Sequence, residues 1–214
     1  TLVSLLVFNN FSANAFPIKP AQPVINIFIY SYIFRIIDVK YNLMCGFIGF
    51  ITDIKNKENS LIYNKFDFYF NELKKRGPDF SQVKKIIYKS KIIQLGFVRL
   101  AIQDLNEKLN KIFYDNDRII LFNGEIYNVN ALKQKYFNEH NFDTNSDTEL
   151  LFELYKKKGK GILNELRGIF SIVFINLKDE TIQLIRDFTG TKPLYYSKNA
   201  DSLYFSSEAW FPYS

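Results

Sequence analysis

A methionine followed directly by a cysteine is the part of the sequence with the clearest capacity for chemistry. Met44 and Cys45 are the only methionine and the only cysteine among 214 residues. If Met44 is removed, one residue carries both a thiol and a free α-amine, whose pKa of about 7.7–8.0 lets it act as a base at neutral pH. This is the arrangement of an N-terminal nucleophile. A peptide nitrogen has no basic lone pair, so Cys45 alone is more simply interpreted as a small buried hydrophobe in a strand.

Short motifs along the rest of the chain change that interpretation. They are Met44-Cys45-Gly46, Arg76-Gly77-Pro78-Asp79, Arg99-Leu100-Ala101-Ile102-Gln103-Asp104, Asn123-Gly124-Glu125-Ile126-Tyr127-Asn128, Ser146-Asp147-Thr148-Glu149, Leu166-Arg167-Gly168-Ile169-Phe170, Arg186-Asp187, Gly190-Thr191-Lys192-Pro193-Leu194-Tyr195-Tyr196 and Ser206-Ser207-Glu208. In this order and approximate spacing, the chain resembles the glutaminase (class II glutamine amidotransferase) domain of glutamine-hydrolysing asparagine synthetases. The resemblance runs from Met44 to about Trp210.

The resemblance implies which residues carry out the chemistry. Cys45 would attack the side-chain amide of glutamine, giving a thioester and releasing ammonia. The side-chain amide of Asn123 and the backbone N–H of Gly124 would form the oxyanion hole, and losing one such donor typically costs about 10²–10³ in rate. By themselves, Asn123 and Gly124 indicate an ordinary hairpin turn that ends a strand at Phe122.

The resemblance also implies which residues hold the substrate. Arg99 would pair with the α-carboxylate of glutamine, where a forked guanidinium suits bidentate contact. Asp147 would hold the α-ammonium group, a role compatible with that of an acid at a helix N-terminus. Leu100, Ile102 and Glu125 would line the same pocket. The structural alternative for Arg99 is an arginine in a strand, either on the surface or at the edge of the core.

Other charged residues near these motifs are expected to be structural. Arg76 and Asp79 would order the loop near the nucleophile, and His140 would pack in a linker before a helix. Phe97 stands where the family usually has a histidine, a difference that bears on the affinity for glutamine.

The synthetase half of these enzymes has no counterpart in the sequence. That half activates aspartate with ATP through a serine- and glycine-rich phosphate loop, and this chain has no two adjacent glycines. We therefore expect no cofactor in this chain, because ATP and Mg²⁺ would belong to the missing synthetase domain. The expected partners are glutamine and a separate synthetase domain or subunit.

Composition excludes several other classes of function. The formal net charge is +6, but only six of the 28 basic residues are arginine, and arginine is favoured for forked phosphate recognition. We therefore expect no nucleic-acid partner. One cysteine and one histidine cannot build a disulfide framework or a Cys/His zinc site. No apolar run reaches about 18 residues, so we expect a cytoplasmic protein with no membrane partner.

The first 43 residues differ from the rest of the chain. They contain four charged residues and three of the six prolines, without a helical or alternating period. We interpret residues 1–43 as a leader, a propeptide or a non-native upstream extension, and residues 44–214 as the amidotransferase domain. The alternative to an enzyme is a catalytically inert fragment in which the preceding residues block Cys45.

The remainder predicts an α+β fold. The strands are expected at residues 45–52, 86–88, 92–95, 98–102, 119–122, 169–177, 181–186, 194–197 and 203–205, and the helices at 61–75, 129–137 and from a capping box at 146–149 onward. Many hairpins and few crossover helices indicate mainly antiparallel sheets covered by helices. The resemblance implies the four-layer α/β/β/α sandwich of N-terminal-nucleophile hydrolases.

Overall fold

The computed structural model describes residues 3–9, 44–100 and 112–211, which form two five-stranded antiparallel sheets. Sheet A contains β1 (Val3–Asn9), β8 (Thr181–Asp187), β7 (Gly168–Asn176), β6 (Arg118–Ile126) and β5 (Phe113–Tyr114), in this spatial order. Sheet B contains β3 (Phe80–Tyr88), β4 (Lys91–Arg99), β2 (Gly46–Asp53), β10 (Ser202–Ser206) and β9 (Tyr195–Lys198). The helices are α2 (Asn59–Lys74), α3 (Val129–Tyr136), α4 (Asp147–Lys158) and the 3-10 helix η2 (Gly159–Glu165).

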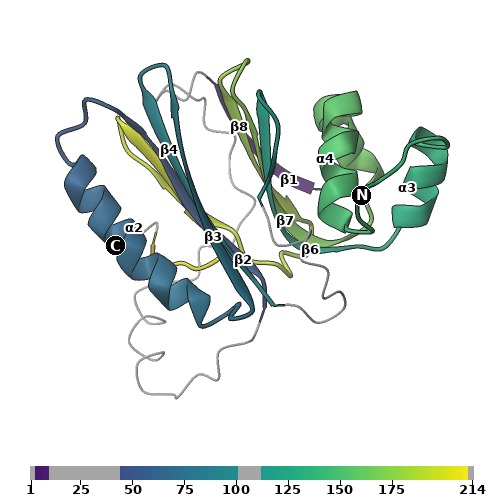
Figure 1. Ribbon diagram of the computed structural model, residues 1–214, viewed down its shortest axis with the longest axis horizontal. Helices are drawn as coiled ribbons and strands as arrows, with labels where there is room; N and C mark the ends of the chain where they lie inside the picture. Colours follow the sequence, from purple (N-terminus) through teal and green to yellow (C-terminus); the bar gives the residue numbers. More distant parts are fainter. Residues whose placement is uncertain (1–2, 10–43, 101–111, 212–214) are drawn as a thin grey trace.

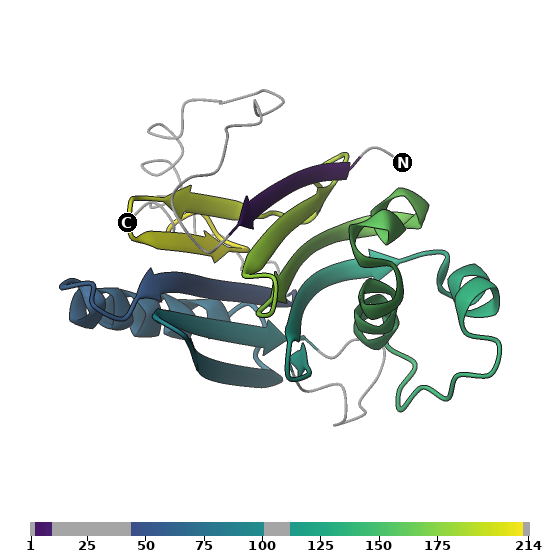
Figure 2. The ribbon, with the colours of Figure 1, turned by 90° about the horizontal axis from the view of Figure 1, so that it is seen from above.

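These elements stack as four layers. The two sheets face each other, α2 covers the outer face of sheet B, and α3 and α4 lie beyond sheet A (Figure 1). Figure 2 shows the same stack turned by 90°. The predicted α/β/β/α sandwich is therefore confirmed. None of the described helices is long and apolar enough to cross a membrane.

Strand β2 has no polar side chain from Gly46 to Ile51, because this part of the strand is buried on both faces. Phe47 and Ile51 point into the core between the sheets, and Ile48 and Phe50 pack under α2. Helix α2 reaches that outer face with residues at helical spacing, including Phe66, which is fully buried. The core is thus divided by sheet B into an inter-sheet layer and an outer layer.

Two strands predicted separately at residues 92–95 and 98–102 form the single strand β4 as far as Arg99. Gly96 does not end the strand, because its missing side chain makes room for α2. A Cβ at this position would lie 2.6 Å from Phe70 Cδ2. The helix therefore packs directly onto the backbone of β4 at that point.

The segment before Met44 contributes a strand that the sequence did not predict. Strand β1 pairs antiparallel with β8, from Val3 opposite Asp187 to Asn9 opposite Thr181. Leu6 packs on the inter-sheet core. A strand that uses both faces shows no alternation of apolar and polar residues, which explains the missing signal. The domain boundary at residues 43 and 44 stays a prediction.

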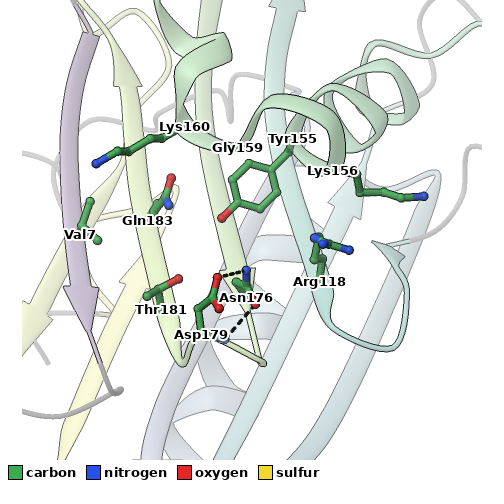
Figure 3. Close-up of a pocket in the computed structure, with 10 residues that line it drawn as sticks. All are labelled: Val7, Arg118, Tyr155, Lys156, Gly159, Lys160, Asn176, Asp179, Thr181 and Gln183. Carbon is green, nitrogen blue, oxygen red and sulfur yellow. Dashed lines mark hydrogen bonds between the residues drawn. The ribbon is translucent and has the colours of Figure 1, made fainter. Parts of the chain in front are cut away.

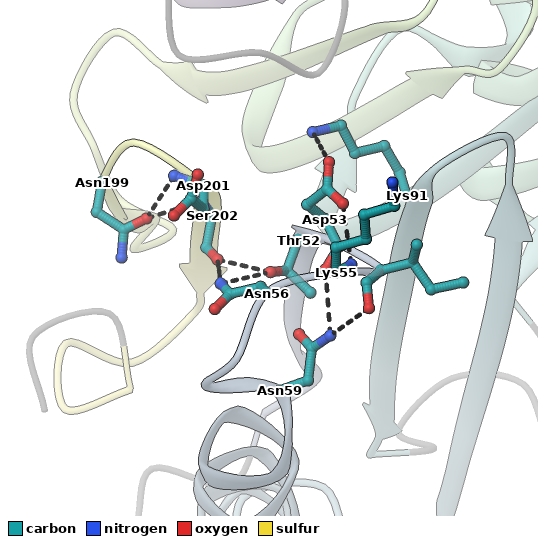
Figure 4. A network of polar contacts seen from close by, with 10 residues as sticks. Thr52, Asp53, Lys55, Asn56, Asn59, Lys91, Asn199, Asp201 and Ser202 are labelled. Carbon is teal, nitrogen blue, oxygen red and sulfur yellow. Dashed lines mark hydrogen bonds and ion pairs between the residues drawn. The ribbon is translucent and has the colours of Figure 1, made fainter.

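A polar network closes the end of β2 that lies away from Cys45 (Figure 4). Asn56 Nδ2 donates to Thr52 Oγ1 at 3.1 Å and to Ser202 Oγ at 3.2 Å, and Ser202 Oγ donates to Thr52 Oγ1 at 2.8 Å. Asn59 Nδ2 donates to the carbonyl of Asp53 at 3.1 Å. These contacts join the turn before α2 to the β9–β10 hairpin.

Candidate active site

Cys45 lies directly before β2 and is half-buried. Its Sγ donates a hydrogen bond to the carbonyl of Leu100 at 3.7 Å. Since Gly46 is paired with Val98, the start of β2 and the end of β4 lie side by side. Two of the predicted site residues, Cys45 and Leu100, are therefore in direct contact. Arg99 directly precedes Leu100 in the sequence.

Arg76 fixes the main chain on both sides of the Met44–Cys45 peptide bond. Its Nε donates to the carbonyl of Cys45 at 3.0 Å, and its own carbonyl accepts from the N–H of Met44 at 2.8 Å. The Arg76 guanidinium also forms an ion pair with Glu208. Arg76 is only 7% exposed, so a buried side chain holds the Met44–Cys45 segment. These contacts agree with the ordering role expected from the sequence.

The rest of the Arg76-Gly77-Pro78-Asp79 motif packs against the end of β4. The backbone N–H of Asp79 donates to the carbonyl of Arg99 at 3.2 Å. A Cβ on Gly77 would lie 2.8 Å from Arg99 N, so the loop approaches the strand more closely than another residue would allow. The motif thus sets the position of the strand end that carries Arg99, which is itself buried.

Side-chain alternation places several predicted site residues toward the space between the sheets. Phe47 on β2 and Leu95 on β4 point into the inter-sheet core. Because side chains alternate along a strand, Arg99, four residues after Leu95 on β4, takes the same side, and Cys45 lies two residues before Phe47. On β6, Leu121 points into the inter-sheet core, so Asn123 does too.

A chain of contacts puts these groups at one end of the sandwich. Gly124 is paired with Phe170 on β7. The N–H groups of Phe170 and Lys192 both donate to Asp187, at 3.1 and 3.2 Å. The Nζ of Lys192 lies 3.3 Å from Met44 Sδ. The end of β6 and the beginning of β2 therefore belong to the same end of the molecule, where β2 and β6 lie side by side (Figure 1).

Asp187 holds the loop that carries Lys192. Besides the two backbone donors, it accepts from the hydroxyl of Thr189 at 2.6 Å and from the N–H of Thr191 at 3.1 Å. Burial raises the pKa of Asp187, but the hydrogen bonds together outweigh it and leave the pKa below its usual value. The Asp187 carboxylate is thus buried and charged, and its hydrogen bonds fix the backbone of the loop up to Lys192.

The structure corrects the interpretation of Asn123 and Gly124 as a turn. Strand β6 runs straight through both residues to Ile126. Glycine is needed at 124 because of the neighbouring strand, since a Cβ there would lie 2.2 Å from the carbonyl oxygen of Ile169. A Cβ on Gly168 would lie 2.1 Å from the carbonyl oxygen of Glu125. The glycines permit close approach of two strands and do not reverse the chain.

Asn123 carries an unpaired donor. The residue is 1% exposed, and its Nδ2 has no hydrogen-bond partner among the described residues. A buried polar group without a partner costs free energy, and native proteins retain such groups mainly where they serve a function. The amide is therefore available for a ligand oxygen.

The predicted capping box is half formed. Ser146 is the N-cap of α4, and its Oγ accepts from the N–H of Glu149 at 3.1 Å. The side chain of Glu149 does not return to Ser146. It accepts instead from the N–H groups of Asp143 and Thr144, at 2.8 and 2.7 Å. The helix start is thus tied to the loop that precedes it.

Asp147, the first residue of α4, reaches from the helix to the sheet. Its Oδ2 accepts from the N–H of Ile126 at 2.7 Å. Burial raises the pKa of Asp147 and the charge of Glu125 adds to this, whereas the Ile126 hydrogen bond and Lys133 lower it; the net shift is upward. Glu125 is exposed beside Asp147 at the end of β6. Ile102 lies outside the described residues.

Three residues that contact Met44 or its neighbours Arg76 and Phe47 had no role in the sequence-based site. Glu208 pairs with Arg76, Lys192 contacts Met44, and Ser207 Oγ accepts from the N–H of Phe47 at 3.1 Å. Their only signal in the sequence was that they lie within the motifs. The ring of His140, expected to be structural, makes an edge-to-face contact with the ring of Phe142, with 4.6 Å between the ring centroids.

A separate cavity of about 390 Å³ lies between α4 and the β7–β8 hairpin (Figure 3). The described residues that line it include none of the predicted site residues. It is lined by Val7, Arg118, Tyr155, Lys156, Gly159, Lys160, Asn176, Asp179, Thr181 and Gln183. Burial raises the pKa of Tyr155 to about 12, so the phenol in this cavity stays protonated.

Comparison with known proteins gives a consistent result. Residues 44–210 match the family model of the glutamine amidotransferase domain. A putative glutamine-hydrolysing asparagine synthetase of Methanocaldococcus jannaschii is 35% identical over 181 residues, which cover 77% of this chain and 34% of that protein. Asparagine synthetase 2 of Bacillus subtilis is 32% identical over 166 residues, 77% of this chain and 22% of the relative. Asparagine synthetase B of Escherichia coli is 32% identical over 168 residues, 77% of this chain and 29% of the relative.

The chain thus spans about a third or less of the length of these three relatives. The family match covers the elements from β2 to β10, with Cys45, Asn123 and Asp147 in the arrangement described above. The chain belongs to the glutamine amidotransferase domain family.

Proposed function

We propose that this chain hydrolyses glutamine to glutamate and ammonia when Cys45 is the N-terminal residue. The observation that carries the proposal is the position of Cys45 directly before β2, where Arg76 holds its carbonyl and its Sγ lies 3.7 Å from the carbonyl of Leu100. A nucleophile needs this kind of fixed main chain, because a small displacement of the reacting atoms costs much of the rate.

The first half of the reaction forms a thioester. The free α-amine of Cys45 takes the thiol proton, and the sulfur attacks the side-chain carbonyl carbon of glutamine. The Asn123 amide and the Gly124 N–H donate to the oxygen of the tetrahedral intermediate. The C–N bond then breaks, and the proton held by the amine passes to the nitrogen, which leaves as ammonia.

The second half releases glutamate. Water attacks the thioester carbonyl, the amine again accepts a proton, and the same two donors stabilise the oxyanion. The C–S bond breaks and the sulfur regains its proton. The reaction uses groups of the chain and water, so no cofactor takes part.

Two charged side chains select a free amino acid as substrate. Arg99 pairs with its α-carboxylate, and Asp147 pairs with its α-ammonium group through Oδ1, since Oδ2 already accepts from Ile126. Leu100 and Ile102 line the pocket, with Glu125 at its rim.

The ammonia is destined for ATP-dependent amidation of aspartate by a synthetase domain or subunit outside this chain. The support is that the relatives named above are glutamine-hydrolysing asparagine synthetases and are much longer than this chain. The second candidate is an inert fragment, favoured by the peptide bond that joins Cys45 to Met44 and occupies the nitrogen the mechanism needs as its base.

Covalent trapping tests the proposal. The full chain is given a protease recognition sequence that ends directly before Cys45, is cut, and is incubated with a glutamine analogue that carries a diazoketone in place of the amide. We expect one adduct, mapped to Cys45 by mass spectrometry and suppressed by excess glutamine. An equal yield of adduct in the uncut chain, or no adduct after cutting, contradicts the proposal.

A further inference from the structure

Strand β1 is the edge strand of sheet A next to β8, and it pairs with β8 along the whole length of β8. Its residues pair with β8 in continuous antiparallel register from Val3–Asp187 to Asn9–Thr181 (Figure 2). An uncovered edge strand exposes a row of N–H and C=O groups that readily accept another extended segment. β8 is therefore built to bind a strand, and the segment that occupies it lies upstream of the amidotransferase family match.

Side chains on both faces of β1 are packed. Leu5 lies against the apolar cluster between sheet A and α4, and Leu6 lies against the inter-sheet core. Phe8 is 7% exposed and belongs to the inter-sheet core, where its ring meets the edge of Tyr196 at a centroid distance of 5.8 Å. Lys198 Nζ lies 5.2 Å from the centre of the Phe8 ring. The strand is thus held by apolar contacts as well as by its hydrogen bonds.

Val7, between Leu6 and Phe8 on β1, also lies against the rest of the protein. Its side chain lines the cavity beside β8, together with Thr181 and Gln183 (Figure 3). All of these contacts join residues 3–9 to residues that follow Met44 in the sequence.

We propose that β8 is a strand-binding edge that keeps residues 3–9 bound after the chain is cut before Cys45, so that the working protein consists of two associated pieces. The inference rests on the proposed function in one respect, since the cut is what frees the Cys45 amine. In that cut, a protease hydrolyses the peptide bond between Met44 and Cys45. Water supplies one oxygen of the new carboxylate on the upstream piece and one hydrogen of the new amine on Cys45. The partner recognised by β8 is an extended apolar segment, and the segment that fits it is residues 3–9 of this chain.

Native mass spectrometry of the cut full chain tests this directly. After cleavage directly before Cys45, we expect the summed mass of both pieces under native conditions and two separate masses after denaturation. The pieces should also co-elute in gel filtration. Elution of the upstream piece apart from the remainder, whatever the state of the remainder, overturns the proposal.

Variants locate the binding to β1. Phe8→Asp should weaken the association of the two pieces by at least about tenfold, because a charge replaces a buried ring. Val83→Asp, at an exposed position on the edge strand β3 of the other sheet, is the matched control and should leave the association unchanged. Equal retention of the upstream piece with Phe8→Asp overturns the assignment to β1.

A second measurement covers the case in which Phe8→Asp prevents folding. The cut wild-type protein is mixed with a labelled synthetic peptide of residues 1–12, and exchange into the protein is followed by native mass spectrometry. Uptake of the peptide with displacement of the upstream piece supports the proposal, and no uptake at a large excess overturns it. Neither readout requires ammonia release, so a bound upstream piece in a protein without glutaminase activity would refute the proposed function alone.

Discussion

Asp147 Oδ2 accepts a 2.7 Å hydrogen bond from the backbone N–H of Ile126, so a single carboxylate joins the first residue of α4 to the last residue of β6. Oδ2 is satisfied by the protein itself. Oδ1 has no protein partner among the described residues and remains available for an ammonium group. The fold therefore sets the direction of the carboxylate that the mechanism assigns to the substrate.

Replacing Asp147 with asparagine tests that assignment. The amide oxygen can still accept from Ile126, but the charge that pairs with the α-ammonium group is gone. Since hydrogen bonds to charged groups contribute about 1.5–3 kcal/mol, we expect KM for glutamine to rise by roughly 10- to 100-fold with a smaller change in kcat. Steady-state kinetics on the cut chain measure both, and Asp179→Asn, in the separate cavity, is the control. An unchanged KM would remove Asp147 from the substrate site.

The same carboxyl predicts a pH dependence. Because burial raises the pKa of Asp147 in the folded protein, the group stays protonated to a higher pH than an exposed aspartate. We expect kcat/KM for glutamine to fall as pH decreases through this raised pKa, since the neutral carboxyl cannot pair with an ammonium group. The sign for stability is opposite: the contribution of Asp147 is fully present at low pH and is lost as pH rises through its folded pKa. A pH–rate profile in which Asp147→Asn retains the acidic limb would contradict this.

Asn123 allows activity to be separated from stability. Its Nδ2 makes no hydrogen bond to any residue that the structure describes, so Asn123→Ala removes no such contact of that donor. We expect kcat to fall about 10²–10³-fold if the amide stabilises the oxyanion. The free energy of unfolding, measured with urea, should change by less than the roughly 2–5 kcal/mol of a large core truncation. Full activity in this variant would exclude an oxyanion role.

Gly124 and Gly161 provide a matched pair of glycine substitutions. In Gly124→Ala the new methyl group would meet the backbone of Ile169 at 2.2 Å, which neither strand can avoid without moving. We expect a loss of about 1–3 kcal/mol in the free energy of unfolding, and reduced activity because β6 shifts. Gly161 has nothing within 4 Å of its Cβ position, so Gly161→Ala should change stability by no more than about 0.5 kcal/mol. Equal stabilities of the two variants would refute the close approach of β6 and β7.

Local signals in the sequence were sufficient to predict the elements whose structure depends on their own residues. The N-cap Ser146 and the hairpins from β7 to β8 and from β9 to β10 formed as predicted. In each case the cue lies within a few residues of the structure it specifies. The family was also predicted from local signals, because the short motifs and their order along the chain can be read directly from the sequence.

Features that depend on a distant strand could not be predicted from local residues. Asn123 and Gly124 are typical of a turn, and only the position of Ile169 on β7 shows that glycine is required inside a strand. Strand β1 gave no alternating pattern, because its two faces meet two different cores. The contacts of Arg76 with Cys45 and Glu208 span 31 and 132 residues of sequence, so no spacing rule could indicate them.

The central claim is that Cys45 hydrolyses glutamine only with a free α-amine. Ammonia release from glutamine by the full chain, before and after cleavage directly before Cys45, measures this most directly, with Cys45→Ser as the control. The account predicts glutamine-dependent ammonia from the cut chain alone, and none above background from the uncut chain or from the cut Cys45→Ser variant. Equal ammonia release before and after cleavage, or release that survives in Cys45→Ser, would contradict it.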